Sequence, residues 1–263
     1  MQEDTKSPTV IDEKNSYRFL HILLDMGVGM LCSGAEINRV EENILKVGSF
    51  YNVKEVNVFV IPSMITVTLR VNEVFELTQT RRIKPQSISV NLNRLEKLNG
   101  ICHRLRDRQF SLDELDAAIK DSDVSVAPLR FVIGSIIAAA SFTLFFGGSF
   151  TDALASALIA LIVCLLQRKV SPYISNRIIF NFICALTVGL VSGFAANYIF
   201  LFNNDKVIIG NIMLIVPGIA FTVSVRDIIL EDTISGSLKL IDSLFMAGGL
   251  ALGILVSFLL RGV

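Results

Sequence analysis

The residues best suited to handling a solute lie in one apolar stretch, residues 211–227, whose middle is the pair Pro217-Gly218. Proline lacks an amide hydrogen and clashes with the carbonyl one turn back, and glycine tolerates backbone angles that a helix does not use. The pair should therefore interrupt a helix. In lipid, the freed backbone groups are tolerated only against protein or a wet cavity, and many transporters hold substrate at broken helices. A kink that serves packing alone is the alternative.

Polar side chains accompany the Pro-Gly pair at helical spacing. At about 100° per residue, Asn211, Gly218 and Thr222 fall on one face of a helix. We therefore predict that Asn211, Pro217, Gly218 and Thr222 bind the solute. Backbone donors at the break and the amide and hydroxyl side chains would supply the hydrogen bonds.

Two carboxylates could couple transport to protons. Asp227 follows the broken segment, and Asp242 shares a face with Gly249 and Gly253 in the last apolar segment. A carboxylate just inside a membrane span is costly and usually faces the interior of a helix bundle. Asp227 or Asp242 is thus the predicted coupling residue. Ordinary placement at the membrane interface explains both positions equally well.

The composition divides the chain into two unlike halves. Residues 1–126 hold 16 of the 24 Lys and Arg and 18 of the 24 Asp and Glu, although the whole chain has zero net charge and a mean hydropathy of +0.60. A half with few charges is typical of a membrane domain, and a half with mixed charges of a soluble one. We predict a disordered N-terminus over residues 1–15, a cytoplasmic α+β domain over residues 16–126, and an all-α membrane domain of five transmembrane helices over residues 127–263.

Several functional classes are disfavoured. The four cysteines form no CxxC pair, the two histidines lie far apart in sequence, and no nucleophile–base pair stands out. We therefore expect neither a metal site, nor a cofactor, nor an enzyme. The slightly acidic first half argues against nucleic acid as a partner. The polar N-terminal residues lack the apolar core of a signal peptide, which predicts a cytoplasmic location for the first half.

The first half shows both helical and strand periodicity. Apolar residues recur at helical spacing in segments expected to be helices over 16–31, 34–51 and 89–108, and alternate with polar residues between 56 and 80. Ser33 followed by Glu36, and Ser111 followed by Glu114, predict capping boxes at helix starts. The result would be a small antiparallel meander packed against helices.

The second half contains five segments near the length of about 20 apolar residues that a membrane span requires. They cover 128–147, 151–167, 176–202, 207–225 and 240–260. Six of the eight cations of this half fall on one side of these spans and two on the other. The positive-inside rule then places the N-terminal domain in the cytoplasm of a bacterium and the C-terminus outside the inner membrane.

Three segments carry a resemblance to a known family. They are residues 31–41 (LCSGAEINRVE), the alternating residues 56–69 with a turn at Pro62, and Val216-Pro217-Gly218 followed by Arg226-Asp227 and Gly236. In this order and spacing the chain resembles the threonine/serine exporter family. The resemblance implies a cytoplasmic domain ahead of a membrane part that exports small amino acids, driven by the proton gradient. It marks Pro217, Gly218, Asp227 and Gly236 as matching positions.

One departure from the family pattern affects the expected partners. The full-length pattern carries about ten spans in two blocks, a length that the span rule makes about twice that of this second half. The chain therefore resembles the larger subunit of a split form, which a second, short multi-span membrane subunit completes and which is linked with export of succinate. The expected ligand is a small anionic or zwitterionic solute. The protein would lie in a lipid bilayer, and it could form an oligomer.

Two other functions stay open from the sequence. A membrane-anchored enzyme would need polar residues of the first half, such as Asp25, Glu36, Arg39 and His103, to converge in one pocket. A homo-oligomeric passive channel would carry solute without an energy source.

Overall fold

The computed structural model describes residues 11–84, 90–108, 110–123, 127–174, 176–198 and 202–262. The chain divides into two compact units. The N-terminal unit comprises the described residues of 1–125 together with Val223–Lys239, and the helical unit comprises those of 126–222 and 240–263. Each unit has a hydrophobic core of its own.

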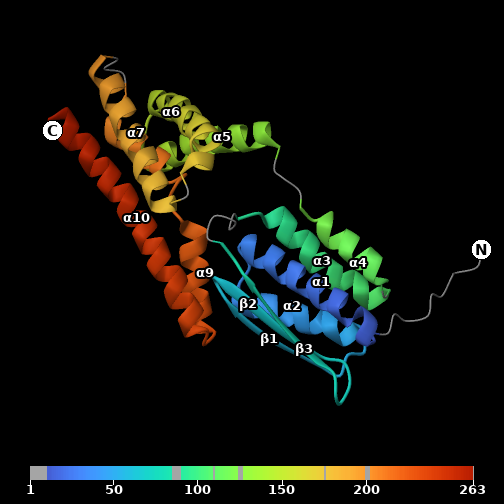
Figure 1. Cartoon of the computed structure of the whole chain (residues 1–263). Helices are drawn as coiled ribbons and strands as arrows, with labels where there is room; N and C mark the ends of the chain where they lie inside the picture. Colours follow the sequence, from blue (N-terminus) through green and yellow to red (C-terminus); the bar gives the residue numbers. More distant parts are fainter. Residues whose placement is uncertain are drawn as a thin grey trace, which may run out of the picture. The chain divides into compact units, whose positions relative to one another are not determined.

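The N-terminal unit is built in layers on a three-stranded antiparallel sheet of order β1-β2-β3. Its strands are β1 (Glu55–Ile61), β2 (Met64–Arg70) and β3 (Glu76–Arg82). Side chains alternate along β2, so that Ile65, Val67 and Leu69 are buried. Helices α1 (Glu13–Cys32) and α2 (Ile37–Phe50) pack on the sheet, and α3 (Leu92–Asp107) and α4 (Leu112–Lys120) pack on α1 (Figure 1). The predicted meander and helices are confirmed.

Helix α1 starts earlier than predicted, whereas α4 starts as predicted. Helix α1 begins at Glu13 rather than Ser16, because the Asp12 side chain accepts a hydrogen bond from the Asn15 N–H and forms a capping box. The prediction of disorder therefore fails for residues 13–15, and residues 1–10 lie outside the described part of the chain. The capping box of Ser111 with Glu114 is confirmed at the start of α4.

The capping box predicted at Ser33 is wrong. Ser33 ends α1 instead, and its hydroxyl donates to the Gly29 carbonyl at 2.7 Å. Gly34 has a φ of +92°, which favours glycine, and so turns the chain sharply. Helix α2 then begins at Ile37 without a side-chain cap. The Glu36 carboxylate is consequently available for a partner elsewhere.

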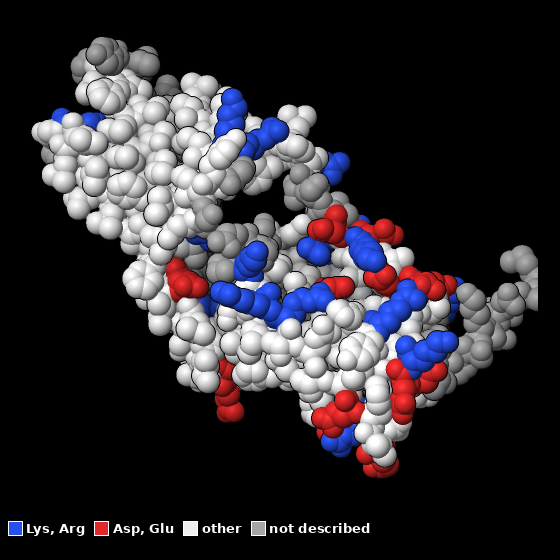
Figure 2. Space-filling view, viewed as in Figure 1, with Lys and Arg blue, Asp and Glu red and all other residues white. Residues whose placement is uncertain are grey.

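The helical unit surrounds the short helix α8 (Asn204–Ile212), which packs against three neighbours. These are α5 (Pro128–Phe145), α6 (Phe150–Lys169) and α7 (Arg177–Tyr198). A short 3-10 helix, η2 (Ser171–Tyr173), follows α6; α9 (Gly218–Ile229) and α10 (Thr233–Arg261) complete the chain. On the face drawn in Figure 2, charged side chains gather over the N-terminal unit and are sparse over α5, α6 and α7.

Four helices among the described residues are long and apolar enough to cross a membrane: α5, α6, α7 and α10. Many of their large apolar side chains are exposed, as lipid-facing side chains would be. The fifth predicted span, residues 207–225, is not a continuous helix. It is divided between α8, of 9 residues, and α9, of 12 residues.

Glycines allow α7 and α10 to approach closely within the helical unit. A Cβ added to Gly249 would lie 2.9 Å from the Ile178 carbonyl oxygen, and one added to Gly253 would lie 2.5 Å from that of Phe182. Small residues at this spacing let membrane helices pack backbone to backbone. Gly249 and Gly253 thus form the contact face of α10 toward α7, whereas a Cβ on Gly134 of α5 would meet no atom within 4 Å.

All four cysteines are buried free thiols, at Cys32, Cys102, Cys164 and Cys184. Burial raises the pKa of the Cys102 thiol to about 11. Because the thiolate is the reactive form, Cys102 has little reactivity near neutral pH.

Candidate functional site

The backbone is interrupted between α8 and α9, as the Pro-Gly pair predicts. Past Ile212, the N–H groups of Leu214 and Ile215 bond to carbonyls three residues back, which tightens the last turn. Pro217 has no N–H to continue the ladder. The Gly218 N–H bonds only two residues back, to the Val216 carbonyl at 2.8 Å, and α9 begins there.

Asn211 is completely buried in the last turn of α8. Its amide nitrogen donates to the Ser156 hydroxyl at 2.9 Å and to the Val207 carbonyl at 3.0 Å, and so connects α8 to α6. Its amide oxygen is buried and has no hydrogen-bond partner among the described residues. Asn211 thus has an unused hydrogen-bond acceptor close to the break, although an unsatisfied buried polar atom lowers the stability of the fold.

The other residues predicted to bind the solute are more exposed than Asn211. Gly218 and Thr222 are exposed, and the Thr222 hydroxyl donates to the Gly218 carbonyl at 2.9 Å. A Cβ added to Gly218 would meet no atom within 4 Å. A helical wheel does not apply across an interrupted helix, which is why the predicted common face fails for Asn211. Solute binding by these residues remains a prediction.

Asp227 belongs to the N-terminal unit, where it forms a buried ion pair. The Lys239 ammonium lies 2.7 Å from one Asp227 oxygen, and the aspartate side chain has no exposed surface. The second Asp227 oxygen has no partner among the described residues. The pair joins α9 to the first turns of α10. Removing one member of such a pair leaves an uncompensated buried charge.

A second carboxylate lies close to this ion pair. Asp232 precedes α10, and its N–H bonds to the Asp227 carbonyl at 2.9 Å. One Asp232 carboxylate oxygen is buried without a partner in the described part of the chain. Burial, and next the charge of Asp227, raise the pKa of Asp232.

An ion pair connects this segment to the residue that precedes α2, and Glu41 of α2 lies nearby. The Arg226 guanidinium lies 2.9 Å from the Glu36 carboxylate, which the missing cap leaves available. The Glu41 carboxylate accepts a hydrogen bond from the Val60 N–H at 3.1 Å. Burial raises the pKa of Glu41, and the charge of Asp232 adds to the rise. Residues 223–239 are therefore attached to the N-terminal unit through the ion pair of Arg226 with Glu36, whereas the like charges of Glu41 and Asp232 repel each other.

The second predicted coupling residue has a different environment. Asp242 is exposed on α10 in the helical unit, and no ion pair to it is found among the residues that the structure describes. Of the two predicted carboxylates, only Asp227 is buried with a counter-charge.

The four polar residues that an enzyme would need are not brought into one described pocket. Asp25 pairs with Arg81, and Glu36 with Arg226. Asp25 lines a cavity of about 510 Å³ between α1, α3 and α4, whose lining includes neither Arg39 nor His103. Within the described ranges, no cluster of three His, Cys, Asp or Glu residues could hold a metal.

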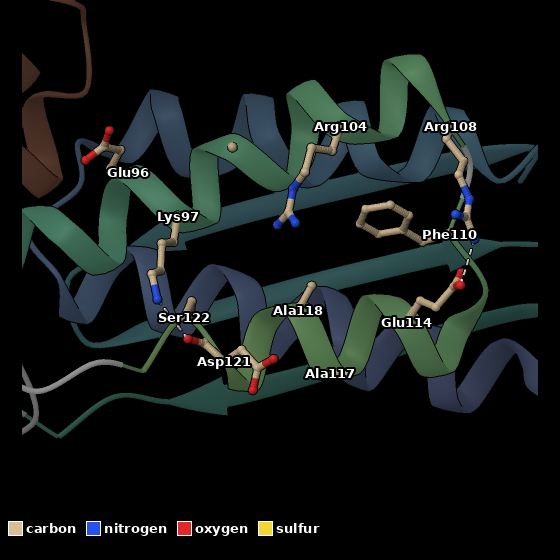
Figure 3. Close-up of a pocket in the computed structure, with 11 residues that line it drawn as sticks. Glu96, Lys97, Arg104, Arg108, Phe110, Glu114, Ala117, Ala118, Asp121 and Ser122 are labelled. Atoms are coloured by element: carbon tan, nitrogen blue, oxygen red, sulfur yellow. Dashed lines mark hydrogen bonds and ion pairs between the residues drawn. The ribbon is translucent and has the colours of Figure 1, made fainter.

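The structure also reveals a charged groove between α3 and α4 that the sequence analysis missed (Figure 3). Lys97 and Arg104 line it from α3, where their spacing of seven residues places them on one side of the helix, and Arg108 lines it directly after the helix ends. This spacing of basic residues is the feature of the sequence that could have indicated the groove.

Residues 21–260 match the family model described as "Putative threonine/serine exporter". No curated protein and no solved structure matches the chain.

Proposed function

The chain belongs to the threonine/serine exporter family, and from that premise we propose that it is a subunit of an exporter of small carboxylates or amino acids. The transported solute would be threonine, serine or a dicarboxylate such as succinate. The exporter would be driven by the proton gradient and completed by a second, short multi-span membrane subunit.

The break between α8 and α9 is the observation that carries this proposal. In the helical unit it combines a proline without a donor, an exposed glycine and the unused acceptor of Asn211. The N-terminal N–H groups of a helix attract negative charge, and α9 begins at the break. A solute carboxylate would accept hydrogen bonds there, and a solute hydroxyl or ammonium would donate to Asn211.

The orientation is part of the proposal. Six cations against two across the spans favour an inner-membrane protein with its N-terminal unit in the cytoplasm and its C-terminus outside.

Replacing the proline at the break tests the solute path. Pro217→Ala restores a backbone donor and should let α8 and α9 join into one helix. We expect efflux of threonine, serine and succinate from loaded cells to fall at least about tenfold, with membrane insertion unchanged. Pro128→Ala is the matched control, because Pro128 occupies the first turn of α5, where proline removes no helical hydrogen bond.

Efflux should be measured with and without a co-expressed candidate second subunit. Equal efflux by wild type and Pro217→Ala would remove Pro217 from the mechanism. Solute flux that persists after the membrane potential and the proton gradient are collapsed would indicate a passive channel instead.

Asp227 is the proposed coupling residue, supported by its burial and its ion pair with Lys239. Asp227→Asn alone would remove the counter-charge that lies 2.7 Å from the Lys239 ammonium and destabilise the fold. The double variant Asp227→Asn with Lys239→Met removes both charges and should restore the folded amount of protein. If Asp227 carries the proton, efflux by the double variant should lose its dependence on the pH gradient, whereas Asp242→Asn should keep it.

A further inference from the structure

The groove between α3 and α4 has a volume of about 730 Å³ and lies within the N-terminal unit. One wall is α3 and the other is α4, and Phe110 closes one end (Figure 3). Gly100, which has no side chain, and the small residues Ala117 and Ala118 also line the groove. A Cβ added to Gly100 would meet no atom within 4 Å, so the space beside it is open.

The charges of the groove are only partly neutralised by one another. Arg108 pairs with Glu114 at 2.8 Å. The Lys97 ammonium donates to the Asp121 backbone carbonyl at 3.3 Å. Within the described ranges, the Arg104 guanidinium pairs with no carboxylate, and the Asp121 carboxylate pairs with no cation. Among the described residues, the groove therefore keeps two cations, Lys97 and Arg104, and two carboxylates, Glu96 and Asp121, without an ion pair.

Arg104 is held in a position suited to binding. Its guanidinium carbon lies 5.6 Å from the centre of the Phe110 ring, a cation–π contact that leaves the guanidinium edges open for hydrogen bonds. Figure 3 shows Arg104 directed from α3 into the space between the two helices, with the Phe110 ring and Ala118 beside that space. A planar guanidinium binds a carboxylate through two parallel hydrogen bonds.

We propose that this groove binds a small carboxylate-bearing solute. The solute carboxylate pairs with Arg104, and its carbon chain lies against Phe110 and Ala118. The unpaired Asp121 carboxylate attracts an ammonium group, so that a zwitterionic amino acid binds more tightly than a dicarboxylate. The inference takes its choice of solutes from the proposed function, but it assigns them a binding site in the N-terminal unit, separate from the break at Pro217.

The test is calorimetric titration of the purified full-length chain with threonine, serine and succinate. Arg104→Met keeps an unbranched side chain but removes the guanidinium, and should weaken binding at least about tenfold, as expected for the loss of a charge-assisted contact. Arg106→Met is the matched control, because Arg106 is also a basic residue in the last turn of α3 but does not line the groove. It should bind within about twofold of wild type.

A second variant separates binding from folding. Gly100→Leu fills the groove without a clash at its Cβ and improves helix propensity. It should abolish binding while the thermal unfolding temperature stays unchanged or rises. No saturable binding of any of the three solutes to wild type, or equal binding by Arg104→Met, would overturn the proposal.

Efflux measurements keep the two proposals apart. Pro217→Ala should lose efflux and retain calorimetric binding, and this result supports a separate groove site. Loss of calorimetric binding in Pro217→Ala, with the fold intact, would contradict it.

Discussion

Five buried carboxamide or carboxylate oxygens have no hydrogen-bond partner in the described part of the chain, and three of them belong to Asn211, Asp227 and Asp232. An unsatisfied buried polar atom costs about 1–3 kcal/mol. Such atoms are uncommon in folded proteins, and each needs an explanation, such as a functional role or an unseen partner. The Asn211 oxygen lies in the last turn before the break, and those of Asp227 and Asp232 lie near the partly buried Lys239.

Gly218 offers the sharpest residue-level test of the solute path. Neither Gly218 nor Gly248 would bring a new Cβ within 4 Å of another atom, so leucine should be accommodated at both positions. We expect Gly218→Leu to obstruct the break and reduce threonine efflux at least about tenfold, because misplacement at a substrate site has effects of that size or larger. Gly248→Leu, on α10, should transport normally. Comparable efflux from both variants would place the path elsewhere.

The interruption of the helix at Pro217-Gly218 was predictable from the sequence, because Pro and Gly act through their own backbone chemistry. The environment of Asn211 was not. Its contact with Ser156 on α6 depends on how α8 packs, and no local pattern encodes that contact. For the same reason the unpaired state of Arg104 could not be read from the sequence.

At the scale of elements, α9 and α10 form a close helical pair at Gly236. A Cβ added there would lie 2.8 Å from the Ser224 carbonyl oxygen and 2.8 Å from the Ile228 backbone nitrogen. Since both neighbours are backbone atoms, neither can rotate away. The resemblance to the exporter family marked Gly236 as a matching position, and the structure gives that glycine a steric reason.

Gly236→Ala should therefore separate α9 from α10 and strain the ion pair between Asp227 and Lys239. We expect a destabilisation of about 1–3 kcal/mol, as is typical of overpacking. Gly248→Ala lies on the same helix with open space around it and should be neutral or stabilising by up to about 1 kcal/mol. Denaturant unfolding of the purified variants measures both values, and an unchanged midpoint for Gly236→Ala would contradict the close contact.

Element types and approximate bounds followed from periodicity, since the alternation of β2 and the helical spacing of α2 and α3 are local properties of the chain. Cap assignment failed at Ser33, because two helices meet there and the serine hydroxyl bonds back to Gly29 in the earlier one. The prediction of a continuous transmembrane helix failed at residues 207–225. Their hydropathy is high enough for a span, but the helical hydrogen bonds of the backbone are interrupted.

At the scale of the whole molecule, the N-terminal unit is assembled from two separate stretches of sequence. Residues 223–239 join the first stretch through the ion pair of Arg226 with Glu36, and Asp232 lies close enough to Glu41 for their like charges to repel. The charge division of the sequence assigned these residues to the membrane half, since Arg226, Asp227 and Lys239 are only a few charges among apolar residues. Contacts between stretches this far apart are set by the tertiary fold.

This attachment should depend on pH. The pKa values of Glu41 and Asp232 are raised in the folded state, so the folded form holds protons more tightly than the unfolded form. The resulting stabilisation is present in full below the unfolded pKa values and is lost as the pH rises through the folded ones. Protection of residues 223–239 from amide exchange, expressed relative to the intrinsic rate at each pH, should therefore be greater near about pH 5 than near about pH 7.5. The double variant Glu41→Gln with Asp232→Asn should reduce this difference, and an unaltered difference would exclude the two carboxyls as its cause.

The four buried thiols make the unmodified chain a ready background for topology mapping. Membrane-impermeant maleimides should label the wild type poorly, since Cys32, Cys102, Cys164 and Cys184 are all shielded. A single cysteine placed at exposed Tyr173 or at exposed Gly262 would then report, from intact cells, which face of the bilayer each position reaches. Sidedness could thus be determined without first deleting any native sulfhydryl.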